Sequence, residues 1–235
     1  MLNEILLILT LPVYFCAVIL AFKLFGKSGL YIMTVICTIS ANIEVMILID
    51  AFGIEQTLGN VLFAATFLIT DILSECYGKK YATKAVNIGI FTSLTFILIS
   101  QSWLLFTPSE ADFVHTAIKT VFANTPRMMI SSLAVYAICQ RLDVWIYHKI
   151  WALTERLSGN KRAFLWLRNN GATLLTQFIN TVLFNVFAFA GVYDTKTLAG
   201  IVFFGYVIYI VTSLLDTPFV YLARKIFENK KTSVQ

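Results

Sequence analysis

Long apolar runs without polar alternation dominate this chain. Seven runs of about 20 residues follow one another, at 5–25, 30–49, 58–77, 85–106, 127–147, 171–192 and 198–223. Each is long enough for an α-helix to cross the ~30 Å hydrocarbon layer of a bilayer. Because lipid offers no partner to backbone groups, only helices or a closed barrel can span it, and unalternating runs of this length exclude a barrel. The pattern predicts seven transmembrane helices.

Composition agrees with a membrane location. Of the 235 residues, 58% are hydrophobic and 13% are charged, whereas soluble domains have about 45–50% and about 25%. A soluble core of this size could not bury the excess apolar surface. The sequence therefore predicts an all-α polytopic membrane protein. The first run is not expected to be a removable signal peptide, because Glu4 precedes it and no small-x-small cleavage site follows it.

Charged residues between the runs predict the orientation. Lysines and arginines gather after the runs 5–25, 58–77 and 127–147 and after the last run. The alternate loops are acidic and carry Asp50, Glu55, Glu110, Asp112 and Asp194. The positive-inside rule then predicts an outside N-terminus and a cytoplasmic C-terminus. The net charge of +5 is thus a topology signal and not a nucleic-acid footprint. The basic loop 149–168 is expected to lie against anionic headgroups.

Two acids stand within the run 58–77. An ionisable group inside the bilayer costs about 2.5–3.5 kcal/mol, so each needs a physical reason. Asp71 and Glu75 are four residues apart and share one helix face. Because like charges on one face repel, at least one of them requires a proton, a cation or a hydrogen-bond donor. An alternative for Glu75 is that it lies among the cytoplasmic headgroups and pairs with Lys79. Asp71 lies deeper in the membrane, so a position among the headgroups is less favoured for it.

Polar residues on other runs extend the candidate site. Asn42 and Glu44 lie two residues apart in the run 30–49, so they cannot share a narrow helix face, and at least one of them is expected to point towards a neighbouring helix. Thr125 and Pro126 predict a cap and a first-turn proline, after which Arg127 enters the membrane edge from outside. Arg127 either balances the acids or snorkels to the outer headgroups. Asp143 lies near the predicted cytoplasmic end of its helix and is expected to orient that helix.

The last two runs carry polar faces at helical spacing. Thr173, Gln177, Asn180 and Phe184 form one face, and Tyr209, Ser213 and Asp216 form another. Interhelical hydrogen bonds, worth roughly 0.6–2 kcal/mol each, are the alternative to a ligand site. Carboxylates accept N–H bonds, amides donate and accept, and aromatic rings stack on flat ligands. The set fits a purine-like ligand, and it also fits an amino acid, a cation or another planar vitamin.

Enzymatic and metal-binding signals are missing from the sequence. It contains no serine-hydrolase, zinc-protease or phosphate-loop motif. Its four cysteines lie in or beside apolar runs without metal-ligand spacing, and its two histidines have no matching partner. The sequence predicts a chain that is not an enzyme and that uses no cofactor, metal or nucleic acid.

Several segments together resemble the queuosine precursor transporter family, a vitamin uptake transporter family. They are ISAN at 39–42, ITDILSECYG at 69–78, PRMMISSLAVYAICQRLDVWIYHKI at 126–150, TLLTQFINTVLFNVFAF at 173–189 and LLDTPFVYLARK at 214–225. The resemblance implies a bacterial inner-membrane importer of 7-deazaguanines: 7-cyano-7-deazaguanine, 7-aminomethyl-7-deazaguanine or queuine. It also implies a six-helix core at 28–226, akin to the substrate-binding subunits of energy-coupling-factor transporters. An extra helix in 1–27 and a tail at 227–235 complete the expected organisation.

The resemblance also assigns expected roles. Substrate-binding residues are expected to be Asn42, Asp71, Glu75, Arg127, Gln177, Asn180, Phe184, Tyr209 and Asp216. Members of the family often have an aspartate where this chain has Asn180 and a lysine near Tyr209. Because this chain has neutral residues at both positions, its substrate preference is expected to shift towards queuine.

The expected mechanism is secondary transport by alternating access. The alternative is a binding subunit that depends on a separate ATP-driven module, and an ion channel ranks lower because no filter loop is seen. Ala17 and Ala21 form a small-xxx-small pattern that suits either a partner helix or a homodimer.

Overall fold

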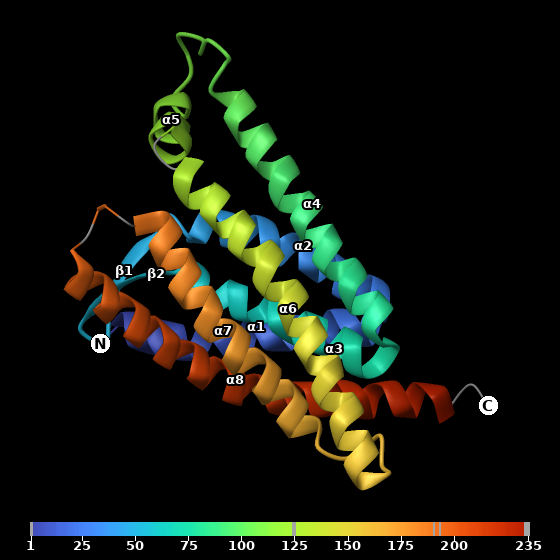
Figure 1. Ribbon diagram of the computed structural model, residues 1–235. Helices are drawn as coiled ribbons and strands as arrows, with labels where there is room; N and C mark the ends of the chain where they lie inside the picture. Colours follow the sequence, from blue (N-terminus) through green and yellow to red (C-terminus); the bar gives the residue numbers. More distant parts are fainter. Residues whose placement is uncertain (1, 124–125, 190, 193, 233–235) are drawn as a thin grey trace.

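The computed structural model describes residues 2–123, 126–189, 191–192 and 194–232. The elements in this part of the chain are α1 (Leu2–Phe25), α2 (Lys27–Glu44), β1 (Leu48–Ala51), β2 (Ile54–Thr57), α3 (Gly59–Tyr77), α4 (Lys79–Trp103), α5 (His115–Ala123), α6 (Pro126–Ser158), α7 (Leu165–Phe189) and α8 (Thr195–Thr232). They form one helical bundle (Figure 1). The prediction of an all-α polytopic membrane protein is confirmed, apart from one short hairpin.

The helices lie where the apolar runs predicted them, but not all of them are long and apolar enough to cross a membrane. In the described part of the chain, six helices are long and apolar enough to cross a membrane: α1, α3, α4, α6, α7 and α8. The helix α2 occupies most of the run 30–49 but does not reach that standard, because its 18 residues include the polar Lys27, Asn42 and Glu44. The count of seven spans therefore stays a prediction. The predicted cap at Thr125 lies outside the described residues.

A β-hairpin replaces the predicted end of the run 30–49. Residues Leu48–Ala51 pair antiparallel with Ile54–Thr57, and the two-residue turn Phe52–Gly53 has φ values of 56° and 77°. Positive φ at both turn positions is the type I′ geometry that matches the twist of paired strands. The prediction of helix up to residue 49 was wrong, since a short apolar run does not distinguish strand from helix.

The hairpin is fastened to α1. Asn3 Nδ2 donates to the Asp50 carbonyl at 2.8 Å, and the Phe52 amide donates to Glu4 Oε1 at 3.1 Å. We call this end of the bundle the hairpin end, and the opposite end, where α8 runs towards the C-terminus, the tail end (Figure 1). The hairpin thus closes one end of the bundle beside the N-terminus.

The helix α3 lies at the centre of the bundle. Every residue from 64 to 74 is buried, and α1, α2, α4, α6 and α8 all pack against this helix. By contrast, α1 exposes a row of large apolar side chains, including Leu6, Leu9 and Val13. Such a surface is stable only against lipid. Polar groups on α3 are therefore removed from both lipid and water.

The segment 149–168 is mostly helical and not the predicted loop. The helix α6 continues to Ser158 and α7 begins at Leu165, so the two helices form a long antiparallel pair joined by a short turn (Figure 1). This correction moves Arg168 from a predicted surface loop into the first turn of α7.

At the hairpin end, Asp194 caps α8. Its carboxylate accepts the Thr197 hydroxyl at 2.5 Å and the backbone amides of Lys196 and Thr197 at 2.9 and 3.1 Å. The Thr197 hydroxyl and these amides hold the pKa of the Asp194 carboxyl below its usual range. This arrangement satisfies amides that an α-helix leaves free at its start.

Close approach of α1 and α2 gives the first prediction. A Cβ added at Gly29 would collide with the backbone carbonyl of Ala21, whereas a Cβ at Gly200 meets no atom within 4 Å. Gly29→Ala is expected to destabilise the protein by about 1–3 kcal/mol, as overpacking does. Gly200→Ala is the matched control and is expected to be neutral or stabilising by up to about 1 kcal/mol. Thermal unfolding in detergent measures both, and equal effects would contradict the packing described here.

Candidate functional site

A polar cavity opens at the hairpin end. We call it the amide cavity, and it is lined by Leu48, Thr57, Asn60, Asn180, Thr181, Phe184, Asn185, Phe189, Ile201, Gly205 and Tyr209. A second space adjoins it and shares Asn60, Asn180, Phe184 and Tyr209, while α2 and α6 add Ala41 and Ser132. The amide cavity therefore lies where α3, α7, α8 and the hairpin meet.

Helical spacing explains why α7 dominates this cavity. One helical turn separates Asn180 from Phe184, and one turn also separates Thr181 from Asn185. These four residues therefore share one face of α7. Asn60 stands in the first turn of α3, directly after the hairpin. The α7 face and Asn60 together place three amides and an aromatic ring around one space.

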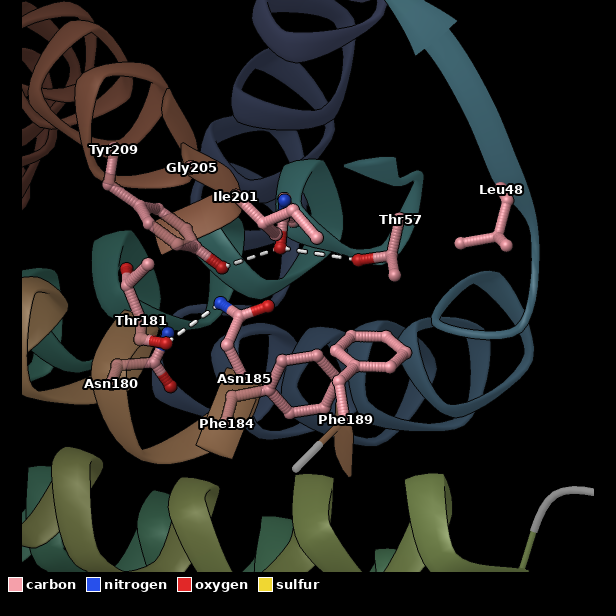
Figure 2. Close-up of a pocket in the computed structure, with 11 residues that line it drawn as sticks. Leu48, Thr57, Asn180, Thr181, Phe184, Asn185, Phe189, Ile201, Gly205 and Tyr209 are labelled. Carbon is pink, nitrogen blue, oxygen red and sulfur yellow. Dashed lines mark hydrogen bonds between the residues drawn. The ribbon is translucent and has the colours of Figure 1, made fainter. Parts of the chain in front are cut away.

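Hydrogen bonds position the polar groups of the cavity. The Tyr209 hydroxyl donates to Asn60 Oδ1 at 2.9 Å, and the Thr57 hydroxyl approaches the same oxygen at 3.4 Å. The Asn185 amide donates to the Thr181 carbonyl at 2.8 Å. Figure 2 shows the side chains of Thr57, Asn185 and Tyr209 around a common space, with the Phe184 and Phe189 rings beside it. Such a set can donate, accept and stack on a flat ligand.

The amide cavity is narrow in this conformation. About 30 Å³ is open to water-sized molecules, which is room for about two waters. Pockets for larger organic ligands commonly measure about 300–1,000 Å³. A bicyclic ligand therefore requires the lining side chains or helices to move apart.

A layer of three buried carboxylates lies in the middle of the bundle. Asp71, Asp143 and Asp216 come from α3, α6 and α8, and they are 1%, 0% and 2% exposed. Each accepts a hydrogen bond from α7: Asp71 from the Thr173 hydroxyl (3.4 Å), Asp143 from the Thr176 hydroxyl (2.8 Å) and Asp216 from the Asn169 amide (2.8 Å). These three donors are neutral groups. We call the three aspartates the carboxylate layer.

Towards the tail end, Glu75 forms a buried ion pair. Arg168 donates to both oxygens of Glu75, with Nη2–Oε1 at 2.7 Å and Nε–Oε2 at 2.9 Å. The Tyr147 hydroxyl donates to Oε2 at 2.8 Å, and Arg224 Nη1 lies 3.3 Å from Oε1. The guanidinium of Arg168 also lies 4.3 Å from the centre of the Trp151 ring, a cation–π contact. Both oxygens of Glu75 are therefore occupied.

This geometry corrects two expectations. Glu75 pairs with arginines from α7 and α8 and not with Lys79 on its own helix. Arg168 is fully buried instead of lying in a basic surface loop. A positive charge in a loop predicts exposure, but the buried Glu75 provides the counter-charge that lets Arg168 enter the bundle.

The predicted site residues divide into groups. Asn180, Phe184 and Tyr209 line the amide cavity, and Gln177 lies behind them and accepts from Asn180 Nδ2 at 3.2 Å. Asp71 and Asp216 belong to the carboxylate layer and Glu75 to the ion pair. The structure thus orders most of the predicted residues along the bundle instead of gathering them in one pocket.

Two predicted residues lie apart from the others. Asn42 is buried between α2 and α4, where it donates to the Thr38 carbonyl at 2.8 Å and to Ser93 Oγ at 3.0 Å. Arg127 is exposed at the hairpin end and donates to the Phe187 carbonyl at 2.8 Å. The buried guanidinium that faces an acid is that of Arg168.

The sequence interpretation missed Asn60, Asn185 and Asp143. Asn185 stands eight residues after Gln177 and so continues the polar face of α7, which was a usable signal. Asp143 was expected to mark a helix end, but α6 extends to Ser158, so this residue lies mid-helix. No pattern in the sequence pointed to Asn60, because it follows a hairpin that was not predicted.

Comparison with known proteins gives a family. A family model described as "Putative vitamin uptake transporter" matches residues 57–223, which include α3, α7, most of α8 and the carboxylate layer. The chain belongs to this family. It is also 37% identical over 221 residues to the "Probable queuosine precursor transporter" of Bacillus subtilis (strain 168), which covers 94% of each chain. No solved structure matches it.

These findings confirm the resemblance read from the sequence motifs. The protein is a multi-pass membrane protein of a transporter family, and the match over 94% of the relative places its whole bundle within the comparison. The likeness to energy-coupling-factor subunits stays a prediction.

The buried ion pair gives the second prediction. Glu75→Gln should destabilise the protein by about 3–5 kcal/mol, because it leaves the buried Arg168 without a counter-charge. Arg168→Gln should cost less, because Arg224 still lies 3.3 Å from Glu75. The double variant should lose clearly less than the two single losses added together, as coupled residues do. The free energies of unfolding in detergent of the wild type, both single variants and the double variant form a double-mutant cycle that measures this coupling.

A surface pair serves as the control for this cycle. Glu155 lies 3.4 Å from Lys161, and both side chains are exposed. Glu155→Gln should cost at most about 1 kcal/mol. Additive losses for Glu75 and Arg168 would show that the two residues are not energetically coupled.

Proposed function

We propose that this protein imports queuosine precursors by secondary transport across a bacterial cytoplasmic membrane. Its substrates are 7-deazaguanines: 7-cyano-7-deazaguanine, 7-aminomethyl-7-deazaguanine or queuine. The observation that carries the proposal is the 37% identity, over 94% of both chains, to a protein named as such a transporter. The proposal assigns the chain no catalytic step.

The chemistry of the amide cavity supports this substrate class. A deazaguanine presents a carbonyl acceptor beside N–H donors on one edge and two flat faces. Asparagine carbonyls accept N–H groups and asparagine amides donate to carbonyls, so Asn60, Asn180 and Asn185 match such an edge. Phe184 and Tyr209 offer rings for stacking. An adenine-like edge would leave some of these buried groups unpaired, which penalises binding.

The acids play a different part from the amides in this proposal. Glu75 is held by Arg168, Arg224 and Tyr147, so we do not assign it to the substrate. Asp71 and Asp216 are buried outside the lining of the amide cavity, so we do not assign them to the substrate either. Because Asn180 and Tyr209 are neutral where other family members often carry charged residues, we assign the larger base queuine as the preferred substrate.

Alternating access requires the narrow cavity to open. The wall formed by α7 and α8 is the moving part in our proposal, because both helices contribute several lining residues. Within α8, Pro218 leaves one carbonyl without its helical partner and provides a point for bending. Opening at the hairpin end would admit the substrate, and opening at the tail end would release it.

The proposed orientation places the hairpin end outside. Exposed cations gather at the tail end, including Lys79, Lys80 and Lys161, which is the pattern of a cytoplasmic face. In intact cells, a charged thiol reagent should label Ser109→Cys from outside and Lys161→Cys only after permeabilisation. The unsubstituted chain is the control, since its cysteines lie in helices α1, α2, α3 and α6. The reverse labelling pattern would invert the topology.

Uptake into liposomes tests the function. Purified protein should transport labelled 7-deazaguanine saturably, with inhibition by guanine-like and not adenine-like bases. Asn180→Ala should lower the initial uptake rate at low substrate concentration by about tenfold, because a lost interaction of about 1.4 kcal/mol corresponds to that factor.

A matched pair of tyrosines controls for general damage to α8. Tyr209→Phe removes the hydroxyl that contacts Asn60 in the cavity, and Tyr206→Phe removes one that contacts the Leu174 carbonyl outside it. Uptake should fall in Tyr209→Phe and stay near wild type in Tyr206→Phe. Equal losses would argue against the amide cavity. Binding without any uptake would favour the alternative, a binding subunit that needs a separate energising module.

A further inference from the structure

The negative charges of the carboxylate layer need compensation, and the amide cavity does not provide it. Three carboxylates are buried in a bundle surrounded by lipid, and their donors from α7 are neutral hydroxyl and amide groups. Burying an unpaired carboxylate is unfavourable by several kcal/mol. The two arginines nearest to this region, Arg168 and Arg224, pair with Glu75 instead. Some other cation must therefore balance the aspartates.

Polar oxygens without a hydrogen-bond partner mark where that cation goes. Among the described residues, they include Asp71 Oδ1, Asp143 Oδ2 and Asn169 Oδ1. Ser74, which is one turn after Asp71 on α3, adds a fully buried hydroxyl that also has no partner. Buried polar atoms are nearly always satisfied in folded proteins. The two carboxylate oxygens in this group, Asp71 Oδ1 and Asp143 Oδ2, thus lack a hydrogen-bond donor.

Two hydroxyls of α7 contact two of the carboxylates. Thr173 Oγ1 lies 3.4 Å from Asp71 Oδ2, and Thr176 Oγ1 lies 2.8 Å from Asp143 Oδ1. A hydroxyl has a single proton, so each can donate to only one carboxylate oxygen. The second oxygen of each carboxylate, Asp71 Oδ1 and Asp143 Oδ2, therefore stays without a partner. A proton added to either carboxylate removes one of the two buried negative charges.

We propose that Asp71 and Asp143 form a relay that holds one exchangeable proton and couples substrate import to the proton gradient. The inference rests on the proposed transport function for its consequence, but the relay itself is a property of the bundle. The proton binds from the hairpin side and leaves to the tail side, and no covalent bond other than an O–H bond forms or breaks.

The surroundings of the relay favour a proton over a metal ion. The charged groups that act on Asp71 are Asp143 from α6, Asp216 from α8 and Glu75 on its own helix, and Cys139 faces Asp143. Glu75 is compensated by its arginines. In the described part of the chain, no group of three or more His, Cys, Asp or Glu side chains could hold a metal ion. A proton needs only one acceptor and one donor to be accommodated.

Infrared difference spectroscopy tests the relay without any substrate. The purified protein in detergent is stepped through pH, and the C=O stretch of a protonated carboxylic acid is followed. Wild type should show a titrating band that Asp71→Asn removes and that Thr173→Val moves to a different midpoint. Asp112→Asn, in an exposed loop, is the control and should leave the band unchanged. A spectrum without a band that depends on Asp71 or Asp143 would overturn the relay.

Transport in liposomes tests the coupling. Counterflow, in which internal unlabelled base exchanges with external labelled base, needs no gradient and reports the proposed function by itself. An alkaline interior should drive accumulation in wild type, up to about tenfold for one pH unit. Asp71→Asn should keep counterflow and lose this accumulation.

The outcomes separate the two proposals. Counterflow without any effect of the pH gradient would overturn the coupling and leave the transport function standing. Accumulation driven by a sodium gradient instead would overturn the assignment to a proton. If counterflow fails altogether, the proposed function fails, and the infrared band still decides whether the relay exists.

Discussion

Polar side chains that a helix carries into the bilayer must find partners on neighbouring helices, because lipid offers none. This constraint acts most strongly on α7. Its Arg168 pairs with Glu75 on α3, its Asn169 with Asp216 on α8, and its Thr176 with Asp143 on α6. These contacts fix the rotation and depth of four helices relative to one another. Apolar packing between lipid-exposed helices does not supply that specificity, since lipid tails pack equally well.

The partners of α7 change in kind along its length. At the tail end they form a full ion pair, in the middle they are carboxylates with neutral donors, and at the hairpin end they are amides, a phenol and aromatic rings. The negative charge of Glu75 is compensated at the tail end. The negative charges of the carboxylate layer are only partly compensated, and the residues that line the amide cavity carry no charge. A neutral base can therefore enter among the amides without meeting a fixed charge. The under-compensated middle level is where a proton has a physical reason to bind.

Sequence patterns predicted what depends on periodicity. The apolar runs located the helices, and the spacing of Gln177, Asn180 and Phe184 located a polar face that lines the cavity. Positions set by pairing across the bundle were not predictable. Arg168 was expected on the surface because nothing near it in the sequence shows that Glu75 lies opposite. The hairpin at 48–57 was missed because four apolar or mixed residues fit a strand and a helix equally well.

Asp143 and Asn60 show a second kind of limit. Each acquires its role from the end of a neighbouring element: Asp143 from the extension of α6 to Ser158, and Asn60 from the hairpin that precedes α3. Element ends are the least reliable part of a sequence interpretation. Arg127 is exposed and donates to the Phe187 carbonyl, and its role at the substrate stays a prediction.

We propose that the substrate binds in the amide cavity. An experimental structure of the protein in lipid nanodiscs, determined with and without saturating 7-cyano-7-deazaguanine, tests this proposal. We expect ligand density between Asn60, Asn180 and Tyr209, with α7 and α8 farther apart than in the narrow conformation described above. Density at another place in the bundle, with the amide cavity unchanged, would contradict it.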